Sequence, residues 1–516
     1  MTNNIPEKDI VNETIKLVED NASDDYTDIG SLNNNNEKHL MEEIFYSGVI
    51  IKNNYVLLKK IGSGSNANVW ITFDILRQNY CAMKIQDNLC YHDGHKEVEI
   101  IKKINKYQNE IHKEHFYCVN MNDCFVFCES EEDKFVCSIY ELYAGSLGMV
   151  LQNGKFKYGL PIPIVKTITR QLLIALSVLH EELQIIHTDI KPENILFKGI
   201  FEDHRIIMKL FEESGFQEKY KALCSLNLSE EIFEKELDDL AVQCVQAIDA
   251  LDIYVGGCEE EFSQDEEDFD ENVYDDDLQN DNDNSDESGE RDVKKFNERR
   301  QSVDDLIEYL QYTQIHDMDE EAGYDFEEIL NKKATTSDPY DIIDEKYLTN
   351  CTIALTDFGN SYFYKERTRN EIQDRKCRAP EIILDLNYGF ACDMWSVSCV
   401  VYELLTGYSL FGLYNVPLNH DIHHLYLMEK IFGSIPISMK KLSKRKKFLF
   451  DKTRNYHIKN ISEFEPVSLK EILIKQHKMN EKDANEVIEF LMCCFKFNPS
   501  QRYTASQLLK HKWLSN

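Results

Sequence analysis

The chain of 516 residues carries 92 Asp and Glu against 57 Lys and Arg, which gives it a formal charge of −35. Its apolar fraction of 42%, with 27 Phe and 27 Tyr, supports a sizeable core and excludes a wholly disordered protein. The acidity also excludes a protein whose whole surface binds nucleic acid or an anionic membrane, because such proteins need a basic footprint.

The acid is concentrated in one segment. Residues 259–292 contain 18 Asp and Glu and a single basic residue, Arg291, so this segment carries −17, about half of the total. It has few aliphatic residues and no periodicity, and it cannot bury enough apolar surface to offset the entropy of ordering. We predict a disordered tract that is either a solvated spacer or an element that binds basic partners.

The first residues and the cysteines indicate the compartment. Residues 1–40 are polar and Asn-rich, lack the features of a signal peptide, and are expected to form a flexible tail. The 15 cysteines are scattered without a CxxC pair, so no zinc site is predicted. These features predict a reduced intracellular protein, cytoplasmic and/or nuclear, without a membrane segment.

The first ordered part is rich in strands. The segments YVLLKKIG, VWITFDI and YCAMKI, from Tyr55 onward, have the β-branched and aromatic residues of short strands. A helix is predicted at His95–Tyr107, and further strands follow through Phe125–Glu141. From Pro163 the apolar residues recur with a period of 3.6, which predicts a helical second part.

Residues 199–348 interrupt this order. Three segments in this spacer look helical and flank the acidic tract, namely Lys209–Ser225, Glu230–Ile248 and Ser302–Thr313. The ordered pattern resumes at Cys351 and is mostly helical to the end. A connection of this length is typical of a functional or disordered insertion.

A glycine-rich segment is the first sign of nucleotide binding. Ile61, Gly62, Ser63, Gly64, Ser65, Asn66, Ala67, Asn68 and Val69 lie between two predicted strands. Glycines there let a backbone approach phosphates closely, although such a hairpin can also be a plain turn, and Ala67 stands where the usual pattern has a third glycine. Lys84 on the next strand fits a lysine that pairs with phosphates, held by Glu97 in preference to Glu99.

The segment Ile186–Leu196 carries the strongest chemical signal. Phosphoryl transfer needs mainly positioning and neutralisation of charge. Asp189 would accept and orient the proton of a substrate hydroxyl, Lys191 would offset charge on the transferred phosphoryl, and Asn194 would hold magnesium. Asp357, in the sequence Thr-Asp-Phe-Gly beyond the spacer, would bind Mg²⁺ that bridges the phosphates.

Together with Ala379-Pro380-Glu381, these motifs resemble a eukaryotic protein kinase, with all parts in order. The resemblance implies an α+β, bilobal fold with a β-rich small lobe, an α-rich large lobe and a long, partly disordered insertion. It implies kinase segments at 50–198 and 349–514 around the spacer 199–348, and ATP with Mg²⁺ as cofactors. It also places Glu141 and Leu142 at the nucleotide, and pairs Arg502 with Glu381.

Several features resemble the SR-protein kinases, which phosphorylate serines in Arg/Ser-rich proteins and carry a long spacer between the halves of the core. They are Trp70, HTDIKPENIL, GLPIPIVKTITRQLL and NEIQDRKCR. Thr188 stands where the family usually has an arginine that binds a phosphate on the activation loop. The absence of this arginine implies activity without phosphorylation of the loop. The resemblance implies a monomeric serine/threonine kinase with basic or Arg/Ser-rich protein substrates and no direct contact with nucleic acid.

Two alternatives stay open. The segment His424–Gly433 resembles the signature of the LAMMER dual-specificity kinases, which also phosphorylate tyrosine. A pseudokinase scaffold would have lost a catalytic residue, whereas Lys84, Glu97, Asp189, Asn194 and Asp357 are all present.

One departure concerns substrate docking. The SR-protein kinases dock arginines in an acidic groove, and the corresponding positions here are Tyr408, His423 and Lys430. The same lobe has the basic run Lys440–Lys447, which is a solvated face, a localisation signal or a partner site. Either the acidic tract supplies the missing attraction, or the substrate is not an Arg/Ser repeat.

Overall fold

The computed structural model describes residues 44–64, 67–86, 88–111, 116–128, 130, 133–152, 154–251, 345–366, 371–412, 419–461 and 464–515. The chain divides into the units Met1–Tyr46 and Ser47–Asn516, and the description below concerns the second. The predicted tail, the acidic tract and the predicted helix at Ser302–Thr313 lie outside the described residues.

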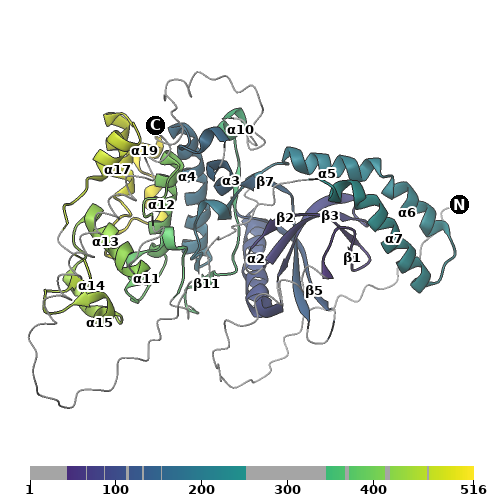
Figure 1. Ribbon diagram of the computed structural model, residues 1–516, viewed down its shortest axis with the longest axis horizontal. Helices are drawn as coiled ribbons and strands as arrows, with labels where there is room; N and C mark the ends of the chain where they lie inside the picture. The colour runs from purple at the N-terminus through teal and green to yellow at the C-terminus, as the bar shows by residue number, and fades with distance from the viewer. Residues whose placement is uncertain are drawn as a thin grey trace, which may run out of the picture. The chain divides into compact units, whose positions relative to one another are not determined.

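The small lobe is built on an antiparallel sheet of six strands in the order β1-β2-β3-β4-β6-β5 (Figure 1). The strands are β1 (Ile50–Ile51), β2 (Tyr55–Ser63), β3 (Ala67–Asp74), β4 (Asn79–Gln86), β5 (Met121–Cys128) and β6 (Lys134–Tyr140). The predicted helix is α2 (Tyr91–Ile111), which is longer than its periodic core and packs against β5 and β6. Strands β2 and β3 are consecutive and antiparallel, so the glycines near the end of β2 lie at the hairpin that joins the two strands.

The insertion begins with ordered helices. They are α5 (Glu202–Glu213), α6 (Phe216–Ser225) and α7 (Glu230–Asp249). The sequence pattern predicted α5 and α6 as one helix, but Gly215 adopts a left-handed backbone (φ 71°) that ends the first helix and begins the second. The helix predicted at Glu230–Ile248 is α7, with nearly the same bounds.

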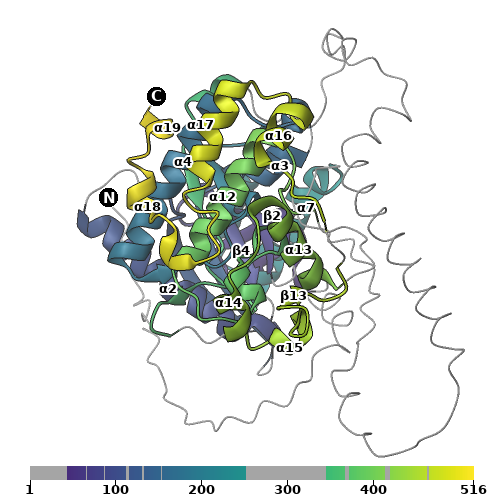
Figure 2. The same cartoon turned by 90° about the vertical axis from the view of Figure 1, so that its left-hand side faces the viewer.

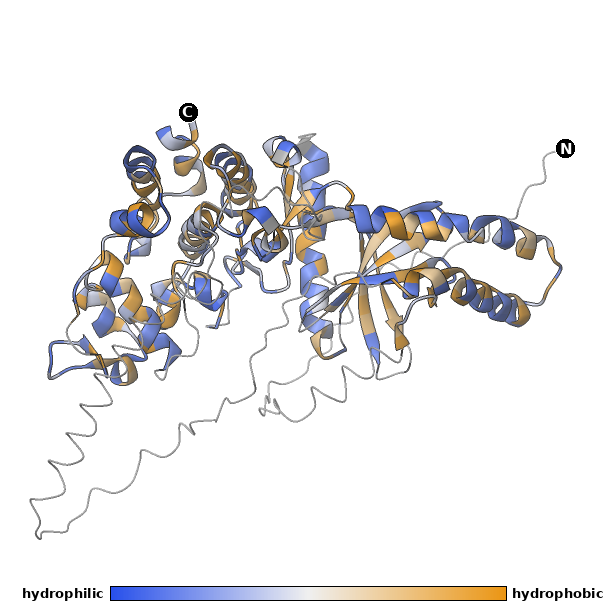
Figure 3. Ribbon diagram, turned by 45° about the horizontal axis from the view of Figure 1, so that its top comes forward, coloured by the Kyte–Doolittle hydropathy of each residue, from blue (hydrophilic) through white to orange (hydrophobic). Residues whose placement is uncertain are grey.

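These three helices cover a face of the small-lobe sheet. Alternate residues of β2 and β3, including Val56, Leu58 and Phe73, point into a core shared with Ile207 and Phe211 of α5. The rings of Phe73 and Phe211 lie 5.2 Å apart. Figure 3 shows polar and apolar residues alternating along these helices, as expected of helices with one buried face.

The large lobe is mostly helical. Its longer helices are α4 (Ile162–Ser177), α12 (Ala391–Thr406), α13 (His420–Phe432) and α17 (Glu481–Leu491). Its shorter helices are α3 (Leu147–Gln152), α10 (Glu345–Thr349), α11 (Pro380–Ile383), α14 (Ile437–Leu442), α15 (Lys446–Leu449), α16 (Leu469–Glu471), α18 (Ala505–Leu508) and α19 (Lys512–Ser515).

Helix α12 lies at the centre of this lobe, with nearly all its residues buried between α4 and α17 (Figure 2). The helical stretch Ile162–Glu182 is long and apolar enough to cross a membrane by length and composition. Its apolar face, however, forms part of the protein core, where Ile168, Leu172 and Leu176 are almost completely buried. The stretch therefore has the burial of a core helix.

Short strands lie where the two lobes meet. They are β7 (Tyr143–Ser146), β8 (Ile185–Ile186), β9 (Ile195–Lys198), β10 (Ile353–Leu355) and β11 (Tyr362–Phe363), and a further pair, β12 (Phe450–Asp451) and β13 (His457–Ile458), lies elsewhere in the large lobe. Strand β9 pairs with both β7 and β10, and β8 pairs with β11. Residues on both sides of the long insertion therefore join in one small sheet, and the predicted α+β, two-lobed fold is confirmed.

We expect Phe211→Ala to destabilise the small lobe by about 3–5 kcal/mol, because the ring is 2% exposed and packs against Phe73 and Phe216. Native-state hydrogen exchange of the β2 and β3 amides would measure the loss. Ile206→Ala is the matched control, since Ile206 lies on the same helix and is 41% exposed. Unchanged exchange in Phe211→Ala would show that α5 does not support the sheet.

Candidate active site

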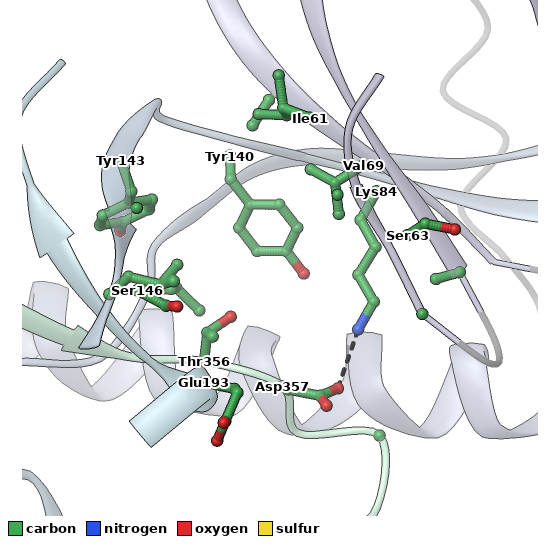
Figure 4. A pocket seen from close by; sticks show the side chains of 18 of the residues that line it. Ile61, Ser63, Val69, Lys84, Tyr140, Tyr143, Ser146, Glu193, Thr356 and Asp357 are labelled. Carbon is green, nitrogen blue, oxygen red and sulfur yellow. Dashed lines mark hydrogen bonds and ion pairs between the residues drawn. The ribbon is translucent and has the colours of Figure 1, made fainter. Parts of the chain in front are cut away.

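A cleft of about 440 Å³ opens between the β2–β3 hairpin and the strands at the lobe junction. Figure 4 shows Lys84 reaching across it toward Asp357, with Tyr140 and Val69 beside it. Its lining has an apolar part and a charged part. The apolar part includes Ile61, Val69, Ala82, Tyr140 and Leu196, and the charged part includes Lys84, Asp189, Lys191 and Asp357. This division suits a nucleotide, which has an apolar base face and an anionic end.

Lys84 joins the small lobe to the loop after β10. Its Nζ lies 2.9 Å from Oε1 and Oε2 of Glu97 on α2 and 3.1 Å from Oδ1 of Asp357. Gln86 Nε2 and the Phe358 amide also donate to Glu97, at 2.7 and 3.3 Å. The structure thus pairs Lys84 with Glu97, whereas Glu99 is exposed.

The ion pairs of this network favour the charged forms of Lys84 and Asp357. Burial alone would lower the pKa of Lys84, but the neighbouring carboxylates of Asp357 and Glu97 raise it above its usual value. In return, the Lys84 ammonium lowers the pKa of Asp357 in spite of burial. An ionised Asp357 and a protonated Lys84 therefore face the charged end of the cleft together.

The catalytic-loop residues converge on Asp189. Asn194 Nδ2 donates to the backbone oxygen and to Oδ2 of Asp189, at 2.9 and 3.0 Å. Lys191 Nζ lies 3.3 Å from Asp189 Oδ2. Burial would lower the pKa of Lys191, but Asp189 and Asp374 raise it, so the side chain stays cationic. A carboxylate, an ammonium and an amide are thus fixed at one point by a six-residue segment.

A buried carboxylate on α12 holds this loop in place. Asp393 accepts hydrogen bonds from the His187 and Thr188 amides, at 2.8 and 2.9 Å, and its Oδ2 lies 2.8 Å from His180 Nε2. Although burial acts to raise the pKa of Asp393, these hydrogen bonds lower it. Thr188 has φ 69°, a left-handed conformation that is strained for a β-branched residue. Its Oγ1 donates to the Asn360 carbonyl, at 2.7 Å.

The segment after the cleft is anchored by ion pairs between arginines and two carboxylates, Glu381 and Asp421. Arg502 makes a bidentate pair with Glu381, with distances of 2.7 and 2.6 Å and both side chains almost completely buried. Arg375 and Arg445 both pair with Asp421 of α13. The stretch from Arg375 to Glu381 is therefore attached to the large lobe at both ends.

The structure brings most of the predicted site residues together. Ile61–Gly64, Ala67, Val69, Lys84, Asp189, Lys191 and Asp357 line the cleft, with Glu97 and Asn194 directly behind. Ser65 and Asn66 lie outside the described residues. The side chain of Asn68 instead accepts a hydrogen bond from Ser63.

Glu141 and Leu142 do not line the cleft, and the Glu141 carboxylate pairs with Tyr143 and Lys198 instead. Sequence reasoning missed several lining residues: Tyr140, Tyr143, Thr356, Phe201 and His204. Tyr140 and Tyr143 flank the predicted pair by one residue on each side. Phe201 and His204 gave no signal, because they belong to the insertion.

The residues present fit a magnesium ion. Asn194 uses its amide nitrogen on Asp189, which leaves its side-chain oxygen for a cation, and Asp357 supplies an ionised carboxylate. Mg²⁺ prefers such oxygen ligands and takes few from the protein in phosphate sites. The described ranges contain no cluster of three or more His, Cys, Asp or Glu side chains suited to a metal. When bound, the ion would neutralise charge on the phosphates.

Comparison with known proteins decides the family. The model of the "Protein kinase domain" matches residues 55–211 and 342–514, most of the chain. The chain belongs to the protein kinase family. It is 48% identical, over 97% of its length and 96% of the relative's, to L205 of Acanthamoeba polyphaga mimivirus, which carries the name of a serine/threonine-protein kinase. By family and relatives, the chain is an enzyme of the serine/threonine kinase class that uses ATP.

Two more distant relatives point to a subfamily. The kinase is 25% identical to protein kinase dsk1 of Schizosaccharomyces pombe, over 89% of this chain and 80% of the relative. It is 22% identical to SRSF protein kinase 3 of Mus musculus, over 91% of this chain and 87% of that protein. The two alignments cover 89% and 91% of this chain, so the similarity to these kinases extends well beyond the short motifs.

We expect Asp189→Asn to lower kcat by about 10³-fold or more, because the amide cannot accept the proton of a substrate hydroxyl. The Kd for ATP, measured by titration calorimetry, should change by less than about threefold, since Lys84 and the glycine-rich hairpin are untouched. Glu481→Gln, an exposed carboxylate on α17, is the control. Turnover close to wild type in Asp189→Asn would remove Asp189 from the chemistry.

Proposed function

We propose that this kinase transfers the γ-phosphoryl group of ATP, with Mg²⁺, to serine or threonine in basic or arginine-rich proteins. Asp189 would accept the proton of the hydroxyl, while Lys191 and Lys84 offset charge on the phosphoryl groups. Asn194 and Asp357 would hold the cation. The relatives named as SR-protein kinases support the choice of substrate.

The observation that carries the substrate class is a group of carboxylates beside the catalytic loop. Asp374, Glu193 and Glu403 interact electrostatically, and the pKa values of Glu193 and Glu403 stay raised although nearby lysines act to lower them. These lysines are Lys191 and Lys376. Burial, together with the charge of Glu193, raises the pKa of Glu403 to about 7. Like charges held together in this way are relieved by a cation, and a guanidinium forms strong paired hydrogen bonds with carboxylates. An arginine near the phosphorylated residue meets both conditions.

The basic run Lys440–Lys447 of the large lobe supports recognition close to the active site rather than on the lobe surface. Within the basic run, Lys440 is buried against Glu429 at 2.8 Å, Lys444 lies 3.0 Å from Asp385, and Arg445 pairs with Asp421. Half of the run therefore stabilises the fold, and the remaining lysines, 441, 446 and 447, are exposed cations. This surface repels arginine repeats, so attraction must come from the carboxylates of the site or from the acidic tract.

We further infer that the kinase is active without phosphorylation of its activation segment. Thr188 stands where an arginine would bind a phosphate, and its hydroxyl instead donates to the Asn360 carbonyl. Arg375 and Arg445 meet the carboxylate of Asp421, which supplies the negative charge that a phosphate would otherwise provide. Constant ion pairs of this kind support a segment that is permanently in place.

We expect the KM for an arginine-containing serine peptide to fall about 5- to 10-fold as the pH rises from 6 to 8. Glu403 has a raised pKa, so it is neutral below about pH 7 and attracts arginine only above it. Glu403→Gln should abolish this pH dependence, and a serine peptide without arginine should not show it. A positional peptide library that favours acidic or proline-containing peptides would contradict the proposed substrate, and phosphotyrosine in the products would favour the dual-specificity alternative.

We expect kcat to stay within about twofold of the untreated wild type after phosphatase treatment. Thr368→Ala, in the activation segment between Asn360 and Arg378, should have equally little effect. Asp421→Asn should lower kcat at least tenfold, because it leaves two arginines facing each other without a carboxylate. Peptide phosphorylation by phosphatase-treated protein, verified as free of phosphate by mass spectrometry, provides the measurement. A tenfold loss on dephosphorylation would refute constitutive activity.

A further inference from the structure

The insertion contributes two side chains to the nucleotide cleft. Phe201 and His204 line the cleft together with residues of both lobes. Phe201 lies three residues beyond the end of β9, which pairs with β7 at the lobe junction. The rings of Phe201 and His204 meet edge to face, with centroids 5.5 Å apart. A segment that interrupts the kinase core is thus part of the wall around its substrate.

Helix α5 fixes the position of His204. His204, Ile207 and Phe211 are three and four residues apart, so they lie on one face of the helix. Ile207 and Phe211 are buried in the core shared with the sheet, and the Tyr80 hydroxyl donates to the Met208 carbonyl at 3.1 Å. The face that attaches α5 to the sheet therefore also presents His204 to the cleft.

His204 has an unsatisfied polar atom. The residue is 6% exposed, and its Nδ1 has no hydrogen-bond partner in the part of the chain that the structure describes. Leaving a buried polar atom unpaired is costly, so such atoms in a binding site commonly await a ligand or water. Burial lowers the pKa of His204 to about 4, so the ring is neutral at physiological pH. A neutral imidazole suits a hydroxyl better than a phosphate.

The layout of the cleft indicates which part of the nucleotide this ring meets. Val69, Ala82, Tyr140 and Leu196 offer apolar surface to a base, and Lys84 and Asp357 lie at the charged end. Between base and phosphates, the hydrogen-bonding groups of ATP are the hydroxyls of the ribose. We propose that His204, supported by Phe201, forms a ribose subsite through which the insertion contributes to ATP affinity. This inference does not depend on which protein is phosphorylated.

The test compares nucleotides that differ by one hydroxyl. His204→Leu keeps the volume and removes both ring nitrogens, so we expect the KM for ATP to rise about 3- to 10-fold with kcat unchanged. The same variant should show no further loss with either 2′-deoxyATP or 3′-deoxyATP, whichever lacks the bonded hydroxyl. His204→Gln, which restores a hydrogen-bonding group, should recover part of the affinity. Arg205→Leu, exposed on the same helix, is the matched control.

Each outcome is decisive. A loss confined to nucleotides that carry one particular hydroxyl, with partial rescue by His204→Gln, supports the subsite. An equal loss for ATP and both deoxynucleotides, or an unchanged KM, overturns it and leaves His204 a packing residue. If His204→Leu does not fold, as judged by its melting temperature, the ATP-to-deoxynucleotide KM ratio of His204→Gln against wild type gives the same decision.

Discussion

The catalytic machinery depends on one buried carboxylate. Asp393 accepts the amide hydrogens of His187 and Thr188 and contacts the ring of His180. These bonds hold Thr188 in a left-handed conformation, a strain of about 1–3 kcal/mol that only a well-determined surrounding can maintain. Asp189 directly follows Thr188, and the side chains of Asn194 and Lys191 both contact the Asp189 carboxylate. Because α12 lies at the centre of the large lobe, the chemistry is positioned from a helix that is almost completely buried.

The charged end of the cleft is completed from the other lobe. Lys84, Glu97 and Asp357 lie on a strand, a helix and a loop, and their mutual ion pairs hold the lobes in register at the site. Helices α5, α6 and α7 of the insertion stabilise the small lobe, because they share a core with its strands β2 and β3. About half of the chain's charge of −35 lies in residues 259–292, beyond the three helices that pack on the sheet. The insertion therefore has two different parts, an apolar support for the kinase core and an acidic tract.

The sequence was sufficient to predict those site residues that lie close together in the chain. Asp189, Lys191 and Asn194 are close neighbours in the chain, so their types and spacing already determine their convergence. Lys84 and Asp357 are 273 residues apart, and only the resemblance to a family could place them together. Features that arise from packing could not be predicted. The contribution of His204 to the cleft and the burial of Lys440 against Glu429 depend on how separate helices pack in the fold. The split between α5 and α6 is local, but a glycine within a helical pattern does not by itself show that the helix ends there.

Asp421 is a fixed negative charge that pairs with two arginines, Arg375 and Arg445. A phosphorylated segment gains its order from a phosphate that attracts arginines, and loses that order when the phosphate is removed. Here a carboxylate on α13 lies between Arg375 of the segment and Arg445 of the neighbouring loop, and all three are part of the chain itself. Position 188 is a threonine rather than an arginine, so it cannot bind a phosphate as an arginine would. Thr188 and the Asp421 ion pairs therefore both agree with the proposed activity without phosphorylation. Under the proposed activity without phosphorylation, control would act on access to substrate or nucleotide, and two residues of the insertion line the nucleotide cleft.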